Sequence, residues 1–135
     1  MRTSGKVGYL SRMRIDTDAR PGINLIRACS NGTITVNETP VSTSLSLSAE
    51  TLTLMPELRG IADLSDVHAN AILGTDPEVV ILGTGSHQVF PDPQWSAHFL
   101  TKSVGVEVMT TAAACRTYNV LAAEHRRVTA LLILQ

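Results

Sequence analysis

The chain has 135 residues, of which 44% are hydrophobic and 17% are charged, and its formal net charge is −1 at pH 7 with the histidines neutral. This length favours a single domain with one hydrophobic core. The near-zero charge argues against nucleic acid as a partner, because phosphate binding needs a basic face of several Lys and Arg side chains. No apolar run reaches the ~20 residues of a membrane-spanning helix, so we expect a soluble protein.

The cysteines and histidines give no sign of a metal site. Cys29 and Cys115 are the only cysteines, they lie far apart in the sequence, and neither belongs to a C-x-x-C pair. This usage fits a reducing compartment, and we expect a cytoplasmic protein. The four histidines include no H-x-x-x-H pair, so we expect neither a metal nor a cofactor.

Charge is distributed unevenly along the chain. Residues 1–27 contain six basic and two acidic side chains, whereas residues 28–100 contain one basic and eight acidic side chains. These charges are either solvated one by one, or they form a dipolar surface that orients a partner. We expect residues 1–14 to be a flexible or edge-pairing N-terminus, and residues 15–135 to be the globular domain.

The first half of the chain has the pattern of antiparallel β structure. Ile23–Cys29 and Thr33–Asn37 are strand-like runs separated by Ser30-Asn31-Gly32, and Asn-Gly is a strong hairpin signal because both residues tolerate positive φ. Over residues 41–47, Val, Thr and Leu alternate with serines, which predicts a half-exposed strand. Leu52–Met55 is expected to be another short extended segment.

The second half alternates helices with apolar strands. The predicted helices run from the Ser65 cap to Leu73, from near Pro93, and from Thr110 to Arg126; the predicted strands are Val79–Leu82, Val104–Met109 and Val128–Leu134. Short strand-helix-strand connections predict parallel neighbours. We therefore expect an α/β fold bordering on α+β: one mixed central sheet with a parallel β-α-β-α-β second half, and an antiparallel hairpin layer from the first half.

The last helix has one apolar stripe, predicted to face the core, that consists of Ala114, Cys115, Tyr118, Leu121 and Ala122. Cys115 on this stripe is expected to be a small buried hydrophobic residue and not a reactive thiolate. Ala112, Ala113 and Ala123 on the flanks are small enough to admit a neighbouring strand or subunit, so a homodimer is one hypothesis.

Gly83-Thr84-Gly85-Ser86 is the best local candidate for a ligand site, because it follows a buried strand and ligands in α/β sheets bind beyond the carboxyl ends of strands. The alternative is a tight turn that needs positive φ. The segment lacks the third glycine of a dinucleotide fingerprint and the lysine of a P-loop. Thr110 and Thr111 either cap the last helix or share one anion or polar ligand with the glycine turn.

No residue pattern identifies a catalytic site. Ser86, His87 and Asp92 lie close in sequence but lack the G-x-S-x-G elbow of a nucleophilic serine. Carboxylates at a catalytic spacing on one element are also absent. We therefore predict no catalytic residue.

Two segments carry a resemblance to a known family. Ala114-Cys115, Thr117-Tyr118-Asn119, Glu124 and Arg126-Arg127-Val128 form one signature, and Ile81-Leu82-Gly83-Thr84-Gly85 forms the other. Over residues 78–134 the chain resembles a small family of domains of unknown function from bacteria and archaea, whose relatives include mitochondrial respiratory complex I assembly factor three. His125 stands where glycine is expected in many relatives, which argues against a tight turn there.

The resemblance implies a compact domain with a mixed sheet and few helices. It also implies a non-enzymatic role in assembly by protein contact, since the mitochondrial relatives act that way. Our first hypothesis is thus a protein-interaction domain, one that aids assembly of a respiratory or other multi-subunit complex through an unknown partner. The alternative is a small-molecule or anion binder, or a minor enzyme, that uses the Gly83-Thr84-Gly85 turn and the Thr110-Thr111 helix start.

Overall fold

The computed structural model describes residues 12–13, 22–30 and 32–135. Its strands are β1 (Arg12–Met13), β2 (Ile26–Ser30), β3 (Thr33–Val36), β4 (Thr39–Val41), β5 (Leu45–Ser48), β6 (Leu52–Leu54), β7 (Val79–Gly83), β8 (Gly105–Met109) and β9 (Val128–Leu132). Its helices are the 3₁₀ turn η1 (Ile61–Asp63), α1 (Asp66–Leu73), α2 (Pro93–Leu100) and α3 (Thr111–Ala123).

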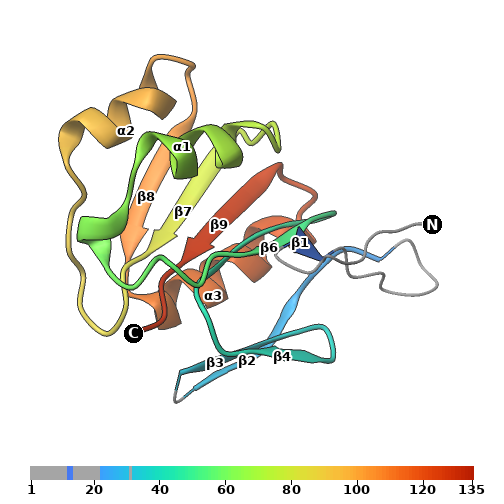
Figure 1. Cartoon of the computed structure of the whole chain (residues 1–135). Helices are drawn as coiled ribbons and strands as arrows, with labels where there is room; N and C mark the ends of the chain where they lie inside the picture. The colour runs from blue at the N-terminus through green and yellow to red at the C-terminus, as the bar shows by residue number, and fades with distance from the viewer. Residues whose placement is uncertain (1–11, 14–21, 31) are drawn as a thin grey trace.

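The strands form two sheets (Figure 1). The central six-stranded sheet has the order β1-β6-β5-β9-β7-β8, and the smaller sheet has the order β2-β3-β4. β7 pairs with β8 and with β9 in parallel, whereas β5 pairs antiparallel with both β6 and β9. The mixed sheet, its parallel second half and the antiparallel hairpin layer are therefore confirmed.

Each face of the central sheet has its own apolar core. The first core lies beneath α3 and the smaller sheet and includes Ile34, Leu47, Ile81 and Tyr118. The second lies beneath α1 and α2 and includes Ile72, Leu82 and Phe99. Because β7 contributes side chains to both cores, all five of its residues are buried, as its continuous apolar run predicted.

The structure describes only two residues of the predicted N-terminal segment. Arg12–Met13 forms β1, which pairs antiparallel with β6 at one edge of the central sheet. The other residues of the predicted 1–14 segment lie outside the described residues. The division into 1–14 and 15–135 therefore stays a prediction.

The prediction of one half-exposed strand over residues 41–47 was wrong. β4 ends at Val41 in the smaller sheet, and β5 begins at Leu45 in the central sheet, so Ser42–Ser44 crosses between the two sheets. All four residues of β5 are buried, because the strand lies between β6 and β9. The Ser44 hydroxyl donates to the Leu58 carbonyl and accepts from the Leu134 amide, so its polarity is satisfied inside the protein.

The helices begin where their sequence signals predicted. The Asp92 carboxylate accepts a hydrogen bond from the Gln94 amide at 2.8 Å, with Pro93 in the first turn. Trp95 and Phe99 stack one turn apart, with ring centroids 5.0 Å apart. Thr110 caps α3 through a hydrogen bond from the Ala113 amide at 3.2 Å. α3 ends at Ala123 and not at Arg126.

Candidate functional site

A cavity of about 450 Å³ lies at the carboxyl ends of β7 and β9. One wall comes from the Gly85–Ser86 turn, from Thr110–Ala112 at the start of α3, and from Ile133–Gln135 after β9. The opposite wall comes from Cys29, Ser30, Gly32 and Thr33 at the tip of the smaller sheet. Four predicted site residues, Gly85, Ser86, Thr110 and Thr111, therefore share one cavity, while Gly83 and Thr84 are not among its lining residues.

The sequence did not predict that the tip of the smaller sheet forms one wall of the cavity. Nothing local to Cys29, Ser30, Gly32 and Thr33 indicates that they face the Gly85–Ser86 turn, because the two segments are brought together by the packing of the smaller sheet on α3. Among the described residues that line this cavity there is no Lys, Arg, Asp or Glu. These residues offer hydroxyl, amide and thiol groups to a ligand.

The glycine turn is tied closely to the start of α3. The Thr111 hydroxyl accepts from the Gly85 amide at 2.8 Å and donates to the Ile133 carbonyl at 2.8 Å, and the Thr111 amide donates to the Gly85 carbonyl at 2.9 Å. Gly85 has a φ of +96°, which favours glycine. The Gly85 and Thr84 amides are already engaged inside the protein, so in this conformation they are not free to cradle an anion.

The loop from Ser86 to Pro91 leads from the edge of the cavity to the start of α2. The Thr84 hydroxyl accepts from the Val89 amide at 3.1 Å, and the Gln88 side-chain amide donates to the Val108 carbonyl of β8 at 2.9 Å. These bonds hold the loop in place, yet Phe90 is 70% exposed and Val89 is 45% exposed. Phe90 was not singled out from the sequence, although it is one of only five aromatic residues.

Tyr118 and Asn119, part of the predicted helix signature, dock α3 on the chain that enters the smaller sheet. The Tyr118 hydroxyl donates to the Asn24 carbonyl at 2.8 Å. The Asn119 side chain accepts from the Ile26 amide at 2.8 Å and donates to the Ile26 carbonyl at 2.7 Å. Burial raises the pKa of the Tyr118 phenol, so the side chain stays a hydrogen-bond donor. These two residues therefore have a structural role, since they hold α3 against the segment that contains Asn24 and Ile26.

Arg126 and Arg127 connect the turn after α3 to the segment before β7. Arg126 Nε lies 3.0 Å from Glu78 Oε2, and the Arg127 amide donates to Glu78 Oε1 at 3.1 Å. The Arg127 amide, followed by Arg126, lowers the pKa of Glu78 below its usual value. Glu124 is the exposed C-terminal cap of α3.

The prediction that His125 argues against a tight turn was wrong. His125 has a φ of 64°, which is the left-handed conformation that glycine prefers after a helix. The His125 amide donates to the Ala122 carbonyl and the Arg126 amide donates to the Leu121 carbonyl, both at 3.0 Å. This is a Schellman-type helix end formed around a histidine.

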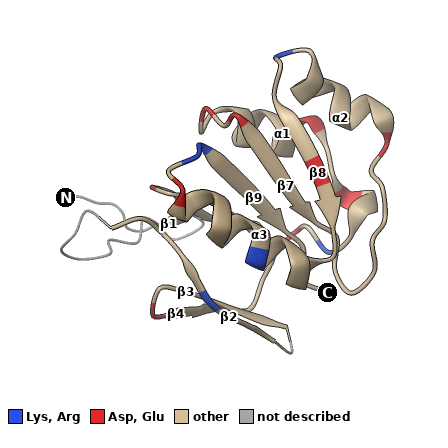
Figure 2. Ribbon diagram, turned by 180° about the vertical axis from the view of Figure 1, so that it is seen from behind, with Lys and Arg blue, Asp and Glu red and all other residues tan. Residues whose placement is uncertain are grey.

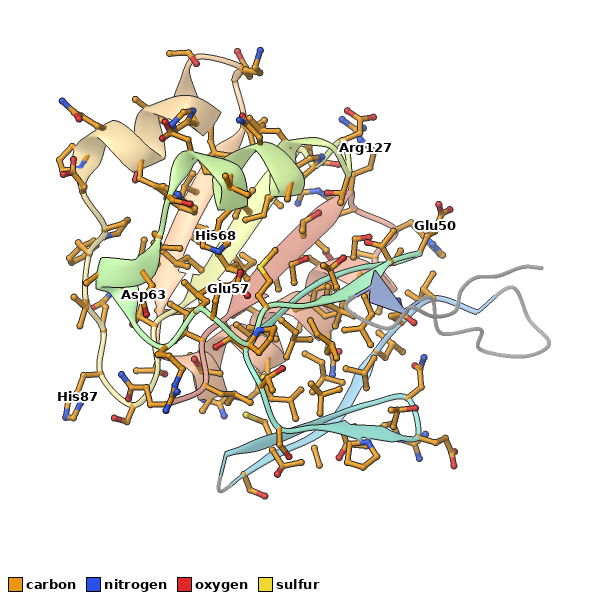
Figure 3. All side chains as sticks on the ribbon, in the orientation of Figure 1. Glu50, Glu57, Asp63, His68, His87 and Arg127 are labelled. Carbon is orange, nitrogen blue, oxygen red and sulfur yellow. The ribbon has the colours of Figure 1, made fainter. Side chains whose placement is uncertain are left out.

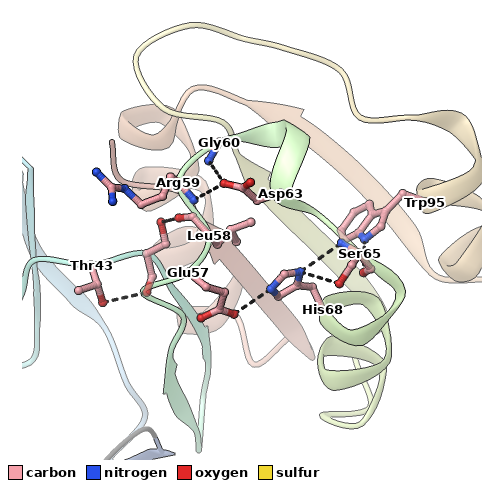
Figure 4. A network of polar contacts seen from close by, with 10 residues as sticks. Thr43, Glu57, Leu58, Arg59, Gly60, Asp63, Ser65, His68 and Trp95 are labelled. Atoms are coloured by element: carbon pink, nitrogen blue, oxygen red, sulfur yellow. Dashed lines mark hydrogen bonds and ion pairs between the residues drawn. The ribbon is translucent and has the colours of Figure 1, made fainter.

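A second polar cluster joins Ser65, His68 and Glu57 (Figure 4). His68 Nδ1 accepts from the Ser65 amide at 3.1 Å, so Nε2 carries the proton and donates to Glu57 Oε2 at 2.9 Å. That hydrogen bond lowers the pKa of Glu57. Although Ser65 Oγ is also 3.2 Å from Nδ1, the lone pair of Nδ1 already accepts the backbone amide. The cluster therefore caps α1 and ties it to the loop after β6.

Histidines and acids do not gather into a metal site in the part of the chain that the structure describes. Figure 3 shows His87 on the outer loop, well away from the buried His68, with Arg127 at the opposite end of the domain. Within the same residues, no helix has the length and apolar character needed to span a membrane.

The fold and the cavity define an α/β domain in which the tip of the smaller antiparallel sheet lines a cavity at the carboxyl ends of β7 and β9 of the mixed sheet. The chain belongs to the family described as "Protein of unknown function (DUF498/DUF598)", which it matches over residues 26–133.

Two curated proteins are similar in sequence. A Francisella tularensis protein called "13 kDa major membrane protein" is 30% identical over 84 residues, which cover 62% of this chain and 68% of that protein. The Xenopus tropicalis NADH dehydrogenase [ubiquinone] 1 alpha subcomplex assembly factor 3 is 41% identical over 56 residues, which cover 42% of this chain but only 31% of that protein.

Solved structures share most of this fold. A Bordetella parapertussis protein matches with a TM-score of 0.79 and 34% identity, over 84% of this chain and 98% of that one. A Bordetella pertussis protein described as a Mth938-like domain matches with a TM-score of 0.75 and 29% identity, over 90% and 92% of the two chains. The resemblance to this family of unknown function, with a complex I assembly factor among its relatives, is thus confirmed.

Proposed function

We propose that this chain is a non-enzymatic protein-interaction domain that docks on a subunit of a multi-subunit complex, such as a respiratory complex, during its assembly. The observation that carries the proposal is Phe90, which is 70% exposed on the loop between β7 and α2. The other aromatic side chains that the structure describes, those of Trp95, Phe99 and Tyr118, are buried. Exposed aromatic side chains are frequent anchors of protein interfaces.

The geometry of the loop favours docking. Thr84 holds the loop backbone at Val89, and the Gln88 side chain is bonded to β8, so less backbone freedom is lost when a partner binds. The loop also starts at the cavity edge, since Ser86 lines the cavity. A partner segment seated on Phe90 could therefore extend toward the cavity.

The relative named as a complex I assembly factor supports this role, although the matched segment covers less than a third of that protein. The test uses cells of the native host that lack the chain. Cells that carry Phe90→Ser should accumulate less of an assembled complex on native gels than cells that carry wild type. Val120→Ser, a matched exposed valine on α3, should restore assembly fully. Normal levels of every respiratory complex in cells without the chain would contradict the proposal.

We place the protein in the cytoplasm, because a reducing compartment suits two free cysteines. The Francisella relative is named as a membrane protein, so the location of this chain is tested by a separate measurement. Fractionation of native cells should recover the chain with the soluble fraction, and recovery with washed membranes would contradict this placement.

A second candidate function is small-molecule binding in the cavity of about 450 Å³, a size within the usual range of ligand sites. The specific observation is that Gly85, Ser86, Thr110 and Thr111 converge on it. A thermal-shift screen of nucleotides, phosphates and carboxylates tests this function. A ligand should raise Tm for wild type and for Ala123→Trp, but not for Ala112→Trp, whose side chain fills the cavity. A flat screen would remove this candidate.

A further inference from the structure

Two thiols that are distant in the sequence meet where the smaller sheet packs on α3. Cys29 of β2 is half-buried, whereas Cys115 of α3 is only 3% exposed. Both cysteines line one cavity of about 270 Å³, and the neighbouring Cys29 contributes to the raised pKa of the Cys115 thiol. The sequence alone gave no reason to pair them.

Hydrogen bonds between α3 and β2 fix the position of the strand that carries Cys29. Asn119 binds both the amide and the carbonyl of Ile26, which fixes the register of β2 against α3. Cys115 lies one helical turn before Asn119, and Cys29 lies three residues after Ile26 on the facing strand. The same pair of hydrogen bonds therefore holds β2 against the part of α3 that carries Cys115.

We propose that Cys29 and Cys115 form a reversible disulfide when the protein meets a peroxide, and that this bond fastens the smaller sheet to α3. The Cys29 sulfur first attacks hydrogen peroxide: an S–O bond forms, the O–O bond breaks, and one water leaves with the thiol proton. The Cys115 sulfur then attacks the Cys29 sulfenic acid: the S–S bond forms, the S–O bond breaks, and a second water leaves. Two thiols are oxidised while one peroxide is reduced to two waters.

The environments of the two cysteines assign their order of reaction. Cys29 can be reached from solvent through the cavity, so it meets the oxidant first. Burial, followed by the neighbouring Cys29, raises the pKa of the Cys115 thiol, so Cys115 stays protonated and does not attack the peroxide itself. Arg27 and Arg116 line the same cavity, on the basic positions of β2 and α3 that are blue in Figure 2. Their positive charges favour the departure of hydroxide from the peroxide, which leaves as water with the thiol proton.

The bond would also alter the larger cavity, because Cys29 and Ala112 line both cavities. Oxidation would thus restrain one wall of the candidate site. A transient, redox-sensing disulfide is the kind that occurs in reducing compartments. The inference does not depend on the proposed docking role.

The experiment treats the reduced full chain with hydrogen peroxide near neutral pH, blocks free thiols with iodoacetamide and measures intact mass. Wild type should lose about 2 Da and take up no iodoacetamide, and dithiothreitol should restore both thiols. Tryptic digestion should then yield one linked pair of peptides that contain Cys29 and Cys115. In Cys115→Ser, dimedone should trap a sulfenic acid at Cys29, and in Cys29→Ser no mass should be lost.

The wild-type masses decide the matter even if the Cys115→Ser variant does not fold. The proposal is overturned if both thiols are alkylated after peroxide treatment, or if Cys29 gains two or three oxygens while Cys115 remains free. A disulfide that joins Cys29 residues of two chains would also overturn it.

Discussion

His125 shows how a single backbone angle affects stability. Its φ of 64° places a side chain with a Cβ atom in the left-handed region, which costs a non-glycine residue about 1–2 kcal/mol. The surrounding helix end requires this angle, because the His125 and Arg126 amides bind the last carbonyls of α3.

His125→Gly should therefore stabilise the protein. The strain relieved is partly offset by the greater freedom of glycine in the unfolded chain, so we expect a gain of about 0.5–1 kcal/mol in the free energy of unfolding. Urea denaturation measures the change. His87→Gly is the control, because His87 is not among the described residues with positive φ, and it should not stabilise. A loss of stability in His125→Gly would contradict the assignment.

The Asn119 side chain ties α3 to β2 of the smaller sheet. It satisfies both polar groups of the Ile26 backbone, and Asn119→Ala would leave both without a partner in a partly buried position. We expect the free energy of unfolding to fall by about 2 kcal/mol. Val120→Ala on the exposed side of α3 should change it by less than about 0.5 kcal/mol. If Asn119→Ala and Val120→Ala lowered the free energy of unfolding equally, the hydrogen bonds between Asn119 and Ile26 would not contribute to stability.

At the scale of elements, α3 and β7 approach so closely that only glycine fits at position 83. A Cβ atom on Gly83 would lie 2.9 Å from the Thr111 Cα and 3.0 Å from the Ala114 Cβ. The family-like Gly83 is thus explained by packing, whereas Gly85 is explained by its φ of +96°.

Gly83→Ala should cost about 1–3 kcal/mol of unfolding free energy, because the helix must move away from the strand. Gly105→Ala on β8 is the matched control, since its Cβ would lie no closer than 3.8 Å to the Val79 side chain. Thermal and urea unfolding of both variants make the comparison. If Gly83→Ala proves as stable as Gly105→Ala, the close approach is not as tight as described.

Elements with strong local signals were predictable from the sequence. The apolar run of β7, the hairpin of β2 and β3, and the caps of α2 and α3 all depend on residues that are neighbours in the chain. The division of residues 41–48 between two sheets was not predictable, because the serine–leucine alternation says nothing about the pairing of β5 with β9.

The same limit applies to the candidate site. Gly85 and Thr111 were predicted to lie together because the carboxyl ends of parallel strands share one edge. The wall formed by Cys29, Ser30, Gly32 and Thr33, and the cavity that Cys29 shares with Cys115, depend on how the smaller sheet packs against α3 through Asn119. Such long-range contacts leave no periodic pattern in the sequence.

At the scale of the whole molecule, two carboxylates make the free energy of unfolding depend on pH in the acid range. His68 lowers the pKa of Glu57, and the turn after α3 lowers the pKa of Glu78. A lowered pKa in the folded state gives stability that is present above the unfolded pKa of about 4.3 and is lost as the pH falls through the folded pKa.

The free energy of unfolding should therefore fall as the pH decreases below about 4.3. The slope should be smaller in Glu57→Gln, although the exposed Glu57 carboxylate limits the contribution of the pair to less than about 1 kcal/mol. Glu107→Gln is the control, because Glu107 forms no ion pair with another described residue. Urea unfolding midpoints between pH 3 and pH 7 give the slopes. Parallel curves for Glu57→Gln and wild type would contradict the role of His68.

The homodimer through Ala112, Ala113 and Ala123 stays a prediction. Ala112 and Ala123 are exposed and Ala113 is half-buried, so the flank is partly open to a second copy. Sedimentation velocity should detect a dimer that Ala123→Glu disrupts, and a monomer at all concentrations would dismiss it.

The central claim is that the loop bearing Phe90 is a docking surface. The most direct measurement replaces Phe90 with the photo-crosslinker p-benzoylphenylalanine in the full chain inside native cells, with the same replacement at Val120 as the matched control. The account predicts that light links position 90, and not position 120, to one subunit of a multi-subunit complex, which mass spectrometry would identify. Crosslinks at position 90 that are no stronger or more specific than those at position 120 would contradict it.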